Sequence, residues 1–163
     1  TSFIKAQADS IGFDMAGLEY RLKTKDSYLR KIKTEWRPGF DYEVKDIIRY
    51  TYIDGPETQV EKIERNINSM TIAGYESINV KNYWLSNGPY KGVNTHVKSP
   101  DGQIFELQYH TQSSFDIKNG KMHELYEEFR NPDTSDKRKT ELENEMQRLS
   151  NGLVKPIGIE RVK

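Results

Sequence analysis

The chain has 163 residues, enough for one domain with a hydrophobic core, and its 25 Lys+Arg balance its 25 Asp+Glu. The resulting formal net charge of zero argues against bulk, non-specific binding to nucleic acid but leaves a local basic site open. The absence of cysteine excludes disulfides and thiolate catalysis, and no stretch approaches 18 apolar residues, so we expect no membrane-spanning segment and no membrane partner.

The first half of the chain predicts helices around one buried strand. We expect a short helix over residues 2–10, and a second helix from an N-cap at Thr24 to about Trp36, ended by Arg37-Pro38-Gly39. Residues 47–53 are rich in β-branched and aromatic side chains, which predicts a strand. Apolar residues at helical spacing predict a third helix over 57–73.

The second half predicts most of a sheet, followed by helices. Strands are expected over 75–85, 93–98 and 103–109, and a short edge strand at the C-terminus. Helices are expected over 113–130, interrupted at Asn119-Gly120, and over 136–149. This order predicts a single α+β domain over 1–163, with a mixed β-sheet of about five strands flanked by helices. Because the chain opens with Thr1 rather than Met, we also expect it to be part of a longer protein.

A row of polar side chains precedes and enters the helix predicted after Thr24. Arg21 and Lys23 would point the same way on an extended segment, and Ser27 and Lys31 are neighbours one helical turn apart. Three cations with a hydroxyl among them suit a polyphosphate. The alternative is a basic helix start that is simply solvated.

The strand predicted over 103–109 alternates sharply. Glu106, Gln108 and His110 share one side, and the residues between them are apolar. This pattern indicates either an antiparallel strand with one wet face or a row of chemical groups along the floor of a cleft. In the second case Glu106 could bind a metal or accept a proton.

Asp46 directly precedes the predicted strand at Ile47-Ile48. It is either an ordinary turn residue or an acid that projects into a cleft. Together with Glu106 it could supply the carboxylates for magnesium-assisted phosphoryl transfer, with the cation row holding the phosphates. The chain has no Walker-type glycine loop and no Gly-x-Gly-x-x-Gly, which excludes P-loop and protein-kinase architectures.

Tyr90 lies in a glycine-containing loop over residues 87–92. Its ring could stack on a nucleobase, or it could cover an edge of the sheet.

Four blocks in order carry a family resemblance: the Arg-x-Lys-x-x-x-Ser-x-x-x-Lys row over 21–31, Asp46-Ile47-Ile48-Arg49, the block from Lys81-Asn82-Tyr83 to Tyr90, and Glu106-Leu107-Gln108-Tyr109-His110-Thr111. In these blocks the chain resembles the synthetase domain of the RelA/SpoT family of alarmone synthetases, including its small single-domain and toxin branches.

The resemblance implies an ATP-dependent, Mg²⁺-dependent pyrophosphokinase that transfers the β,γ-pyrophosphate of ATP to the ribose 3′-hydroxyl of an acceptor purine nucleotide, giving (p)ppApp- or (p)ppGpp-type products. It implies that Asp46 and Glu106 are the catalytic carboxylates and hold the metal. The implied ATP-binding residues are Arg21, Lys23, Ser27, Lys31 and Arg49.

On the acceptor side the resemblance implies Tyr90, Asn94, Gln108 and His110. Asn94 and His110 stand where the family often has His and Arg, so the pattern is more similar to the toxin branches. We therefore expect a toxin or effector with an immunity or antitoxin partner. The zero net charge favours a free purine nucleotide over tRNA as the acceptor. We expect the site of action to be the cytoplasm, either of the same cell or, after secretion, of a target cell. The alternatives are a toxin that modifies the 3′ end of tRNA and a catalytically inactive nucleotide- or RNA-binding module.

Overall fold

The computed structural model describes residues 1–36, 38 and 45–163, which form an α+β fold around one mixed sheet. Within these residues the sheet has five strands in the order β1-β2-β5-β4-β3. The strands are β1 (Asp14–Ala16), β2 (Arg49–Ile53), β3 (Glu76–Asn82), β4 (Val93–Lys98) and β5 (Ile104–His110). β2 and β5 are parallel, and the other neighbouring pairs are antiparallel. The predicted fold class is confirmed.

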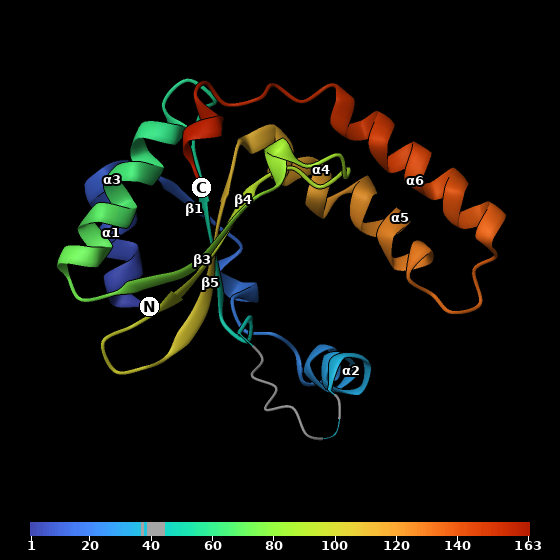
Figure 1. Ribbon diagram of the computed structural model, residues 1–163, viewed down its shortest axis with the longest axis horizontal. Helices are drawn as coiled ribbons and strands as arrows, with labels where there is room; N and C mark the ends of the chain where they lie inside the picture. Colours follow the sequence, from blue (N-terminus) through green and yellow to red (C-terminus); the bar gives the residue numbers. More distant parts are fainter. Residues whose placement is uncertain (37, 39–44) are drawn as a thin grey trace.

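The helices lie on both sides of the sheet. Those in the described part of the chain are α1 (Ser2–Ile11), α2 (Lys25–Glu35), α3 (Gln59–Ile72), α4 (Gln112–Asn119), α5 (Lys121–Phe129) and α6 (Asp136–Asn151). Figure 1 shows α1 and α3 on one side and α4, α5 and α6 on the other, with α2 standing below the second group. None of the helices in these residues is long and apolar enough to span a membrane.

The apolar face of the sheet packs against α1 and α3. Alternation along the strands turns Tyr50 and Tyr52 of β2, and Leu107 and Tyr109 of β5, into this core. Tyr52 is fully buried, and its hydroxyl donates a hydrogen bond to the carbonyl oxygen of Ile4 at 2.6 Å. The opposite face of the same strands is therefore the one available to build a site.

A second, smaller core lies between α5 and α6. It is made of Met122, Leu125, Leu142 and Met146. Gly120 separates α4 from α5, which confirms the predicted interruption at Asn119-Gly120. The hairpin of α5 and α6 thus has its own apolar contacts, apart from the main core.

The start of α2 is fixed by local hydrogen bonds. The Thr24 hydroxyl accepts a hydrogen bond from the backbone N–H of Ser27, as predicted for an N-cap. The preceding segment is extended and bonds to the chain before β2: the N–H of Lys23 donates to the carbonyl of Ile47 at 2.8 Å. This pairing carries the predicted cation row alongside Asp46. Arg37 and Gly39, predicted to end the helix, lie outside the described residues, and α2 ends at Glu35.

Two predictions about the edges of the sheet are wrong. The C-terminus forms a 3-10 helix (Ile159–Arg161) rather than an edge strand, because Gly158 turns the chain with a φ of 75° and Ile159 is buried in the main core. The edge position beside β2 belongs instead to β1, which the sequence analysis missed. The strand predicted to reach residue 85 ends at Asn82, whose side-chain amide donates to the carbonyl of Ile159 at 2.7 Å.

Candidate active site

The register of the sheet brings polar groups together on the face opposite the main core. Arg49 of β2 lies opposite Glu106 of β5, and Asn94 of β4 lies opposite Gln108. Glu106 is 6%, Gln108 3% and His110 0% exposed. The interpretation of this face as wet is therefore wrong, because the polar side of β5 is buried; β5 is antiparallel to β4, as that interpretation expected, but parallel to β2.

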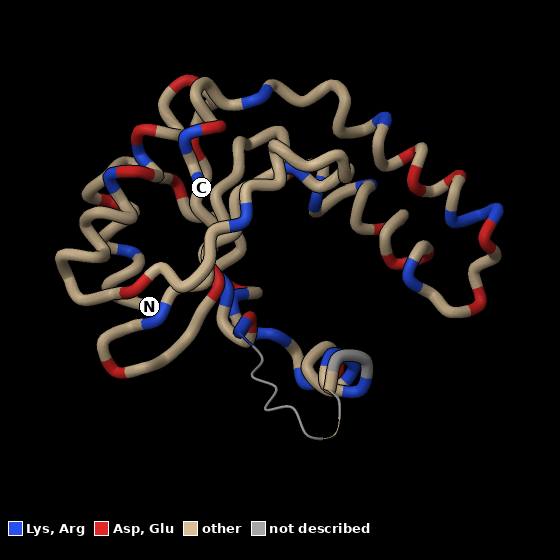
Figure 2. The backbone as a smooth tube through the Cα atoms, viewed as in Figure 1, with Lys and Arg blue, Asp and Glu red and all other residues tan. Residues whose placement is uncertain are grey.

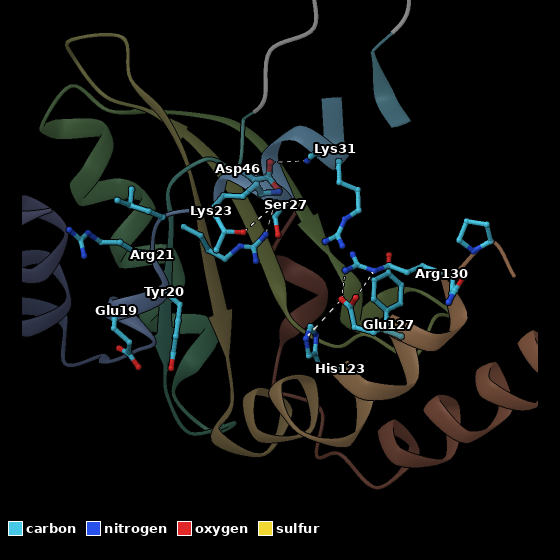
Figure 3. A pocket seen from close by; sticks show the side chains of 17 residues that line it. Glu19, Tyr20, Arg21, Lys23, Ser27, Lys31, Asp46, His123, Glu127 and Arg130 are labelled. Carbon is cyan, nitrogen blue, oxygen red and sulfur yellow. Dashed lines mark hydrogen bonds and ion pairs between the residues drawn. The ribbon is translucent and has the colours of Figure 1, made fainter. Parts of the chain in front are cut away.

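Asp46 is held by the two lysines of the predicted row. Lys23 Nζ donates to Oδ2 at 2.7 Å, and Lys31 Nζ donates to Oδ1 at 2.8 Å (Figure 3). Burial raises the pKa of Asp46, but the hydrogen bonds and charges of the two lysines outweigh it and lower that pKa to about 2. Asp46 is therefore an ionised carboxylate that already faces the proposed phosphate-binding cations.

Arg21 does not join this cluster, although it lines the same cavity as Lys23, Ser27 and Lys31. Its guanidinium donates to the carbonyl of Leu18 at 3.2 Å and points away from Asp46 (Figure 3). The structure thus brings together the two lysines and Asp46 and leaves Arg21 at the side of the cavity.

Glu106 accepts hydrogen bonds from three side chains. Oε2 accepts from Nε of Arg49 and from Nε2 of Gln108 at 3.1 Å, and Oε1 accepts from Nδ2 of Asn94 at 2.9 Å. Nη2 of Arg49 also lies 3.5 Å from Oδ2 of Asp46. Arg49 therefore bridges the two candidate catalytic carboxylates and compensates the charge of both.

Tyr90 and His110 form the next layer. The hydroxyl of Tyr90 donates to Oδ1 of Asn94 at 2.7 Å and lies 3.0 Å from Nε2 of His110. Burial raises the pKa of Tyr90, whereas burial together with Lys118 and Arg49 holds the pKa of His110 well below its ordinary value. A Cβ at Gly92 would lie 2.6 Å from Cε1 of His110, so only glycine fits there. All four predicted acceptor residues thus belong to one network around Glu106.

An open cavity of about 1240 Å³ is lined by the residues of the predicted cation row, Arg21, Lys23, Ser27 and Lys31. One wall carries Lys23, Lys31 and Asp46, and the other is formed by His123 and Glu127 of α5 and by Arg130, which caps that helix (Figure 3). Figure 2 shows Lys and Arg gathered along the segment that leads into α2, whereas α5 and α6 carry both signs. The cavity is thus more basic on the α2 side.

Sequence reasoning missed Lys118 and the wall formed by α5. Lys118 lies on α4, and its Nζ donates to Oε1 of Gln108 at 2.6 Å. Burial and the nearby charge of Arg49 lower the pKa of Lys118 to about 8, although Glu106 opposes this shift. Its only signal in the sequence is that α4 begins directly after β5, so that residues two turns into α4 return to the end of that strand.

The residues present fit a magnesium ion that also binds phosphate. Mg²⁺ prefers carboxylate oxygens and usually takes one or two of them together with phosphate oxygens. Oδ1 of Asp46 and Oε1 of Glu106 each accept one hydrogen bond within the described ranges, which leaves one lone pair on each oxygen. The same ranges contain no group of three His, Cys, Asp or Glu that could hold a metal unaided.

The contacts of Asp46 predict a specific loss of stability in acid for the metal-free protein. A folded-state pKa of about 2, below the ordinary value of 3.8, means that the carboxylate stabilises the fold above pH 4 and that this stabilisation disappears as the pH falls towards 2. We expect the wild type to lose about 2 kcal/mol more than Asp46→Asn between these limits, measured by urea denaturation with chelator present. Parallel losses in both proteins would contradict the assigned contacts.

Comparison with known proteins gives a fold rather than a family. No protein-family model and no curated protein matches the chain. Solved structures do match, and the fold they share with the chain is that of the small alarmone synthetases, as the RelA/SpoT resemblance implied. Small alarmone synthetase 1 from Bacillus subtilis matches with a TM-score of 0.62 and 18% identity, over 92% of this chain and 82% of that chain.

Two further structures have the same fold. The type VI effector Tas1, solved in complex with its immunity protein, matches with a TM-score of 0.57 and 19% identity, over 92% of this chain and 88% of that chain. A GTP pyrophosphokinase family protein from Streptococcus pneumoniae matches with a TM-score of 0.56 and 12% identity, over 92% and 80%. The fold is therefore found both in alarmone synthetases and in a secretion-system effector.

Proposed function

We propose that this domain is an ATP-dependent nucleotide pyrophosphokinase that transfers the β,γ-pyrophosphate of ATP to the ribose 3′-hydroxyl of an acceptor purine nucleotide. The observation that carries the proposal is that Arg49 contacts both candidate catalytic carboxylates. One of them, Asp46, is held by the two lysines, and the other, Glu106, is buried in the sheet. This arrangement puts a cation cluster for phosphate next to a carboxylate that can take a proton. The products would be of the (p)ppApp or (p)ppGpp type.

The donor side would be the wall of the cavity formed by the extended segment and α2. Lys23 and Lys31 now neutralise Asp46, and the phosphates of ATP would compete for the same ammonium groups. Ser27 and Arg21 line the same cavity and would contribute further donors. Mg²⁺ bound by Asp46 would neutralise charge on the transferred pyrophosphate, and the remaining lone pair on Oε1 of Glu106 would then be kept for the proton.

Glu106 would act as the general base. The 3′-hydroxyl oxygen attacks the β-phosphorus of ATP, the bond from that phosphorus to the oxygen bridging to the α-phosphate breaks, and AMP leaves. The hydroxyl proton passes to Glu106, whose Oε1 has one lone pair not used by the described residues. Arg49, which contacts Glu106, would stabilise the negative charge that builds up on the transferred group.

The acceptor would bind beside Tyr90, Asn94, Gln108 and His110. The network that joins them to Glu106 supports this assignment because it would place the ribose of a base held at Tyr90 near the proton acceptor. By similarity to Tas1, we also propose a role as a toxin or effector that acts in the cytoplasm and is neutralised by an immunity protein.

A direct assay tests this function. The purified domain is incubated with Mg²⁺, ATP and each of AMP, ADP, GMP, GDP, GTP and tRNA, and AMP release is followed by anion-exchange chromatography. With AMP as the acceptor, net AMP does not change, so the loss of ATP and the gain of product are followed instead. We expect AMP to appear together with one product, and mass spectrometry and phosphorus NMR should place the new pyrophosphate on the 3′ oxygen. AMP only with tRNA would redirect the proposal to the tRNA 3′ end. Binding of ATP without AMP release under any condition would indicate an inactive nucleotide-binding module.

A further inference from the structure

The side-chain amide of Gln108 lies between a cation and a carboxylate. Its oxygen, Oε1, accepts a hydrogen bond from Nζ of Lys118 at 2.6 Å, and its nitrogen, Nε2, donates to Oε2 of Glu106 at 3.1 Å. An amide can rotate by half a turn and exchange its oxygen and nitrogen, which would put an oxygen against the carboxylate. The ammonium on the far side makes only one of the two orientations favourable.

The same arrangement occurs on the other side of Glu106. Asn94 donates from Nδ2 to Oε1, and its own oxygen accepts from the hydroxyl of Tyr90. Each oxygen of the carboxylate therefore faces an amide N–H₂ group whose orientation is set by an outer donor. Tyr90 sets one amide and Lys118 sets the other.

Lys118 faces no carboxylate directly. Within the described ranges no Asp or Glu oxygen lies within 4.0 Å of its Nζ, and its one hydrogen-bond acceptor is the neutral amide of Gln108. The ammonium is nevertheless half-buried and lies in the field of Arg49, which repels it, and of Glu106, which attracts it. Its favourable electrostatic contact with Glu106 thus runs through the amide.

We propose that Lys118 is a positioning residue, which fixes the amide of Gln108 so that Gln108 donates to Oε2 of Glu106. With Oε2 occupied by Gln108 and Arg49, the lone pair that remains lies on Oε1, on the side of Asn94 and the proposed acceptor site. The catalytic consequence rests on the proposed function, whereas the control of the amide orientation does not.

The orientation is tested first without any activity measurement. In protein labelled with ¹⁵N-glutamine, the Gln108 amide, assigned by its disappearance in Gln108→Leu, should give a pair of proton signals displaced from those of a solvated glutamine, with slow exchange with solvent. Lys118→Met should move these signals towards those of a solvated glutamine and speed their exchange with solvent. Lys118→Arg should largely restore them, and Lys121→Met, which removes an exposed lysine of α5, should leave them unchanged. Unchanged Gln108 signals in Lys118→Met would overturn the inference, whether or not the domain is an enzyme.

The kinetic test uses a double-mutant cycle. We expect Lys118→Met to lower kcat by about 10- to 100-fold with little change in KM for ATP, and to have no further effect in a Gln108→Leu background. Lys118→Arg should recover part of the rate, and thermal unfolding should confirm that each variant is folded. If the losses of kcat from Lys118→Met and Gln108→Leu multiply in the double variant, Lys118 does not act through Gln108 and the inference is overturned. A wild type that releases no AMP with any acceptor would overturn the proposed function and leave the NMR result to decide the amide orientation.

Discussion

Glu106→Gln should reduce the rate of AMP formation at saturating ATP and acceptor by about 10²- to 10⁴-fold, the range that general-base catalysis contributes. The glutamine side chain has nearly the same shape, but its amide cannot accept a proton at neutral pH. It also presents an N–H₂ group to a site where Arg49, Asn94 and Gln108 already supply donors. The loss should therefore fall on kcat, measured by following AMP in single-turnover and steady-state assays.

The variant should stay folded, which makes the result interpretable. Arg49 keeps its contact with Asp46, and its side chain is 40% exposed, so water can solvate the charge that Glu106 no longer balances. Glu76→Gln, at an exposed position on β3, is a matched control that should keep the wild-type rate and melting temperature. A wild-type rate in a folded Glu106→Gln protein would remove Glu106 from the mechanism.

Removing the two lysines that hold Asp46 should lower kcat/KM for ATP about as strongly as Glu106→Gln lowers kcat. Lys23→Ala/Lys31→Ala eliminates two ammonium groups that reach the same carboxylate within 2.8 Å and line the cavity. Hydrogen bonds to charged groups each contribute roughly 1.5–3 kcal/mol, so kcat/KM for ATP should fall by at least about 100-fold. Calorimetric titration with a non-hydrolysable ATP analogue would measure the loss of binding directly.

The control for this prediction uses two other lysines of α2, the helix that also carries Lys31. Lys25→Ala/Lys33→Ala removes the same charge from exposed positions of α2 that do not line the cavity. It should weaken ATP binding several-fold at most, and high salt should erase the difference from wild type. Equal losses of ATP affinity in the two double variants would mean that ATP binding depends only on the overall charge of this region and not on Lys23 and Lys31 themselves.

Much of the fold was predictable because it follows local patterns. The alternation at Leu107 and Tyr109 identified the core face of β5, and Thr24 identified the start of α2. The edge strand β1 has only three residues with weak strand preference, Asp14, Met15 and Ala16, and it exists because β2 offers a partner. Long-range pairing of this kind leaves little trace in a local pattern.

The site was predictable as a set of residues but less so as an arrangement. Spacing brought Lys23 and Lys31 to one place, yet it also placed Arg21 with them, and the local helical turn after Leu18 directs Arg21 elsewhere. That Asp46 would be neutralised by the lysines, and that Glu106 would be enclosed by amides, depends on side-chain packing across three strands. Lys118 was missed because its one signal, the start of α4 directly after β5, does not say which residue of the helix reaches the polar side of that strand.

The parallel pairing of β2 with β5 has a consequence for when the domain can act. Arg49 and Glu106 meet only because two segments far apart in the sequence are joined in one register, and a slip by one residue would turn Glu106 towards the apolar core. No fragment or partly folded chain that lacks this pairing can contain the site. Under the proposed function, a newly made or unfolded copy would therefore have no activity until its sheet is complete, and activity would itself report correct folding.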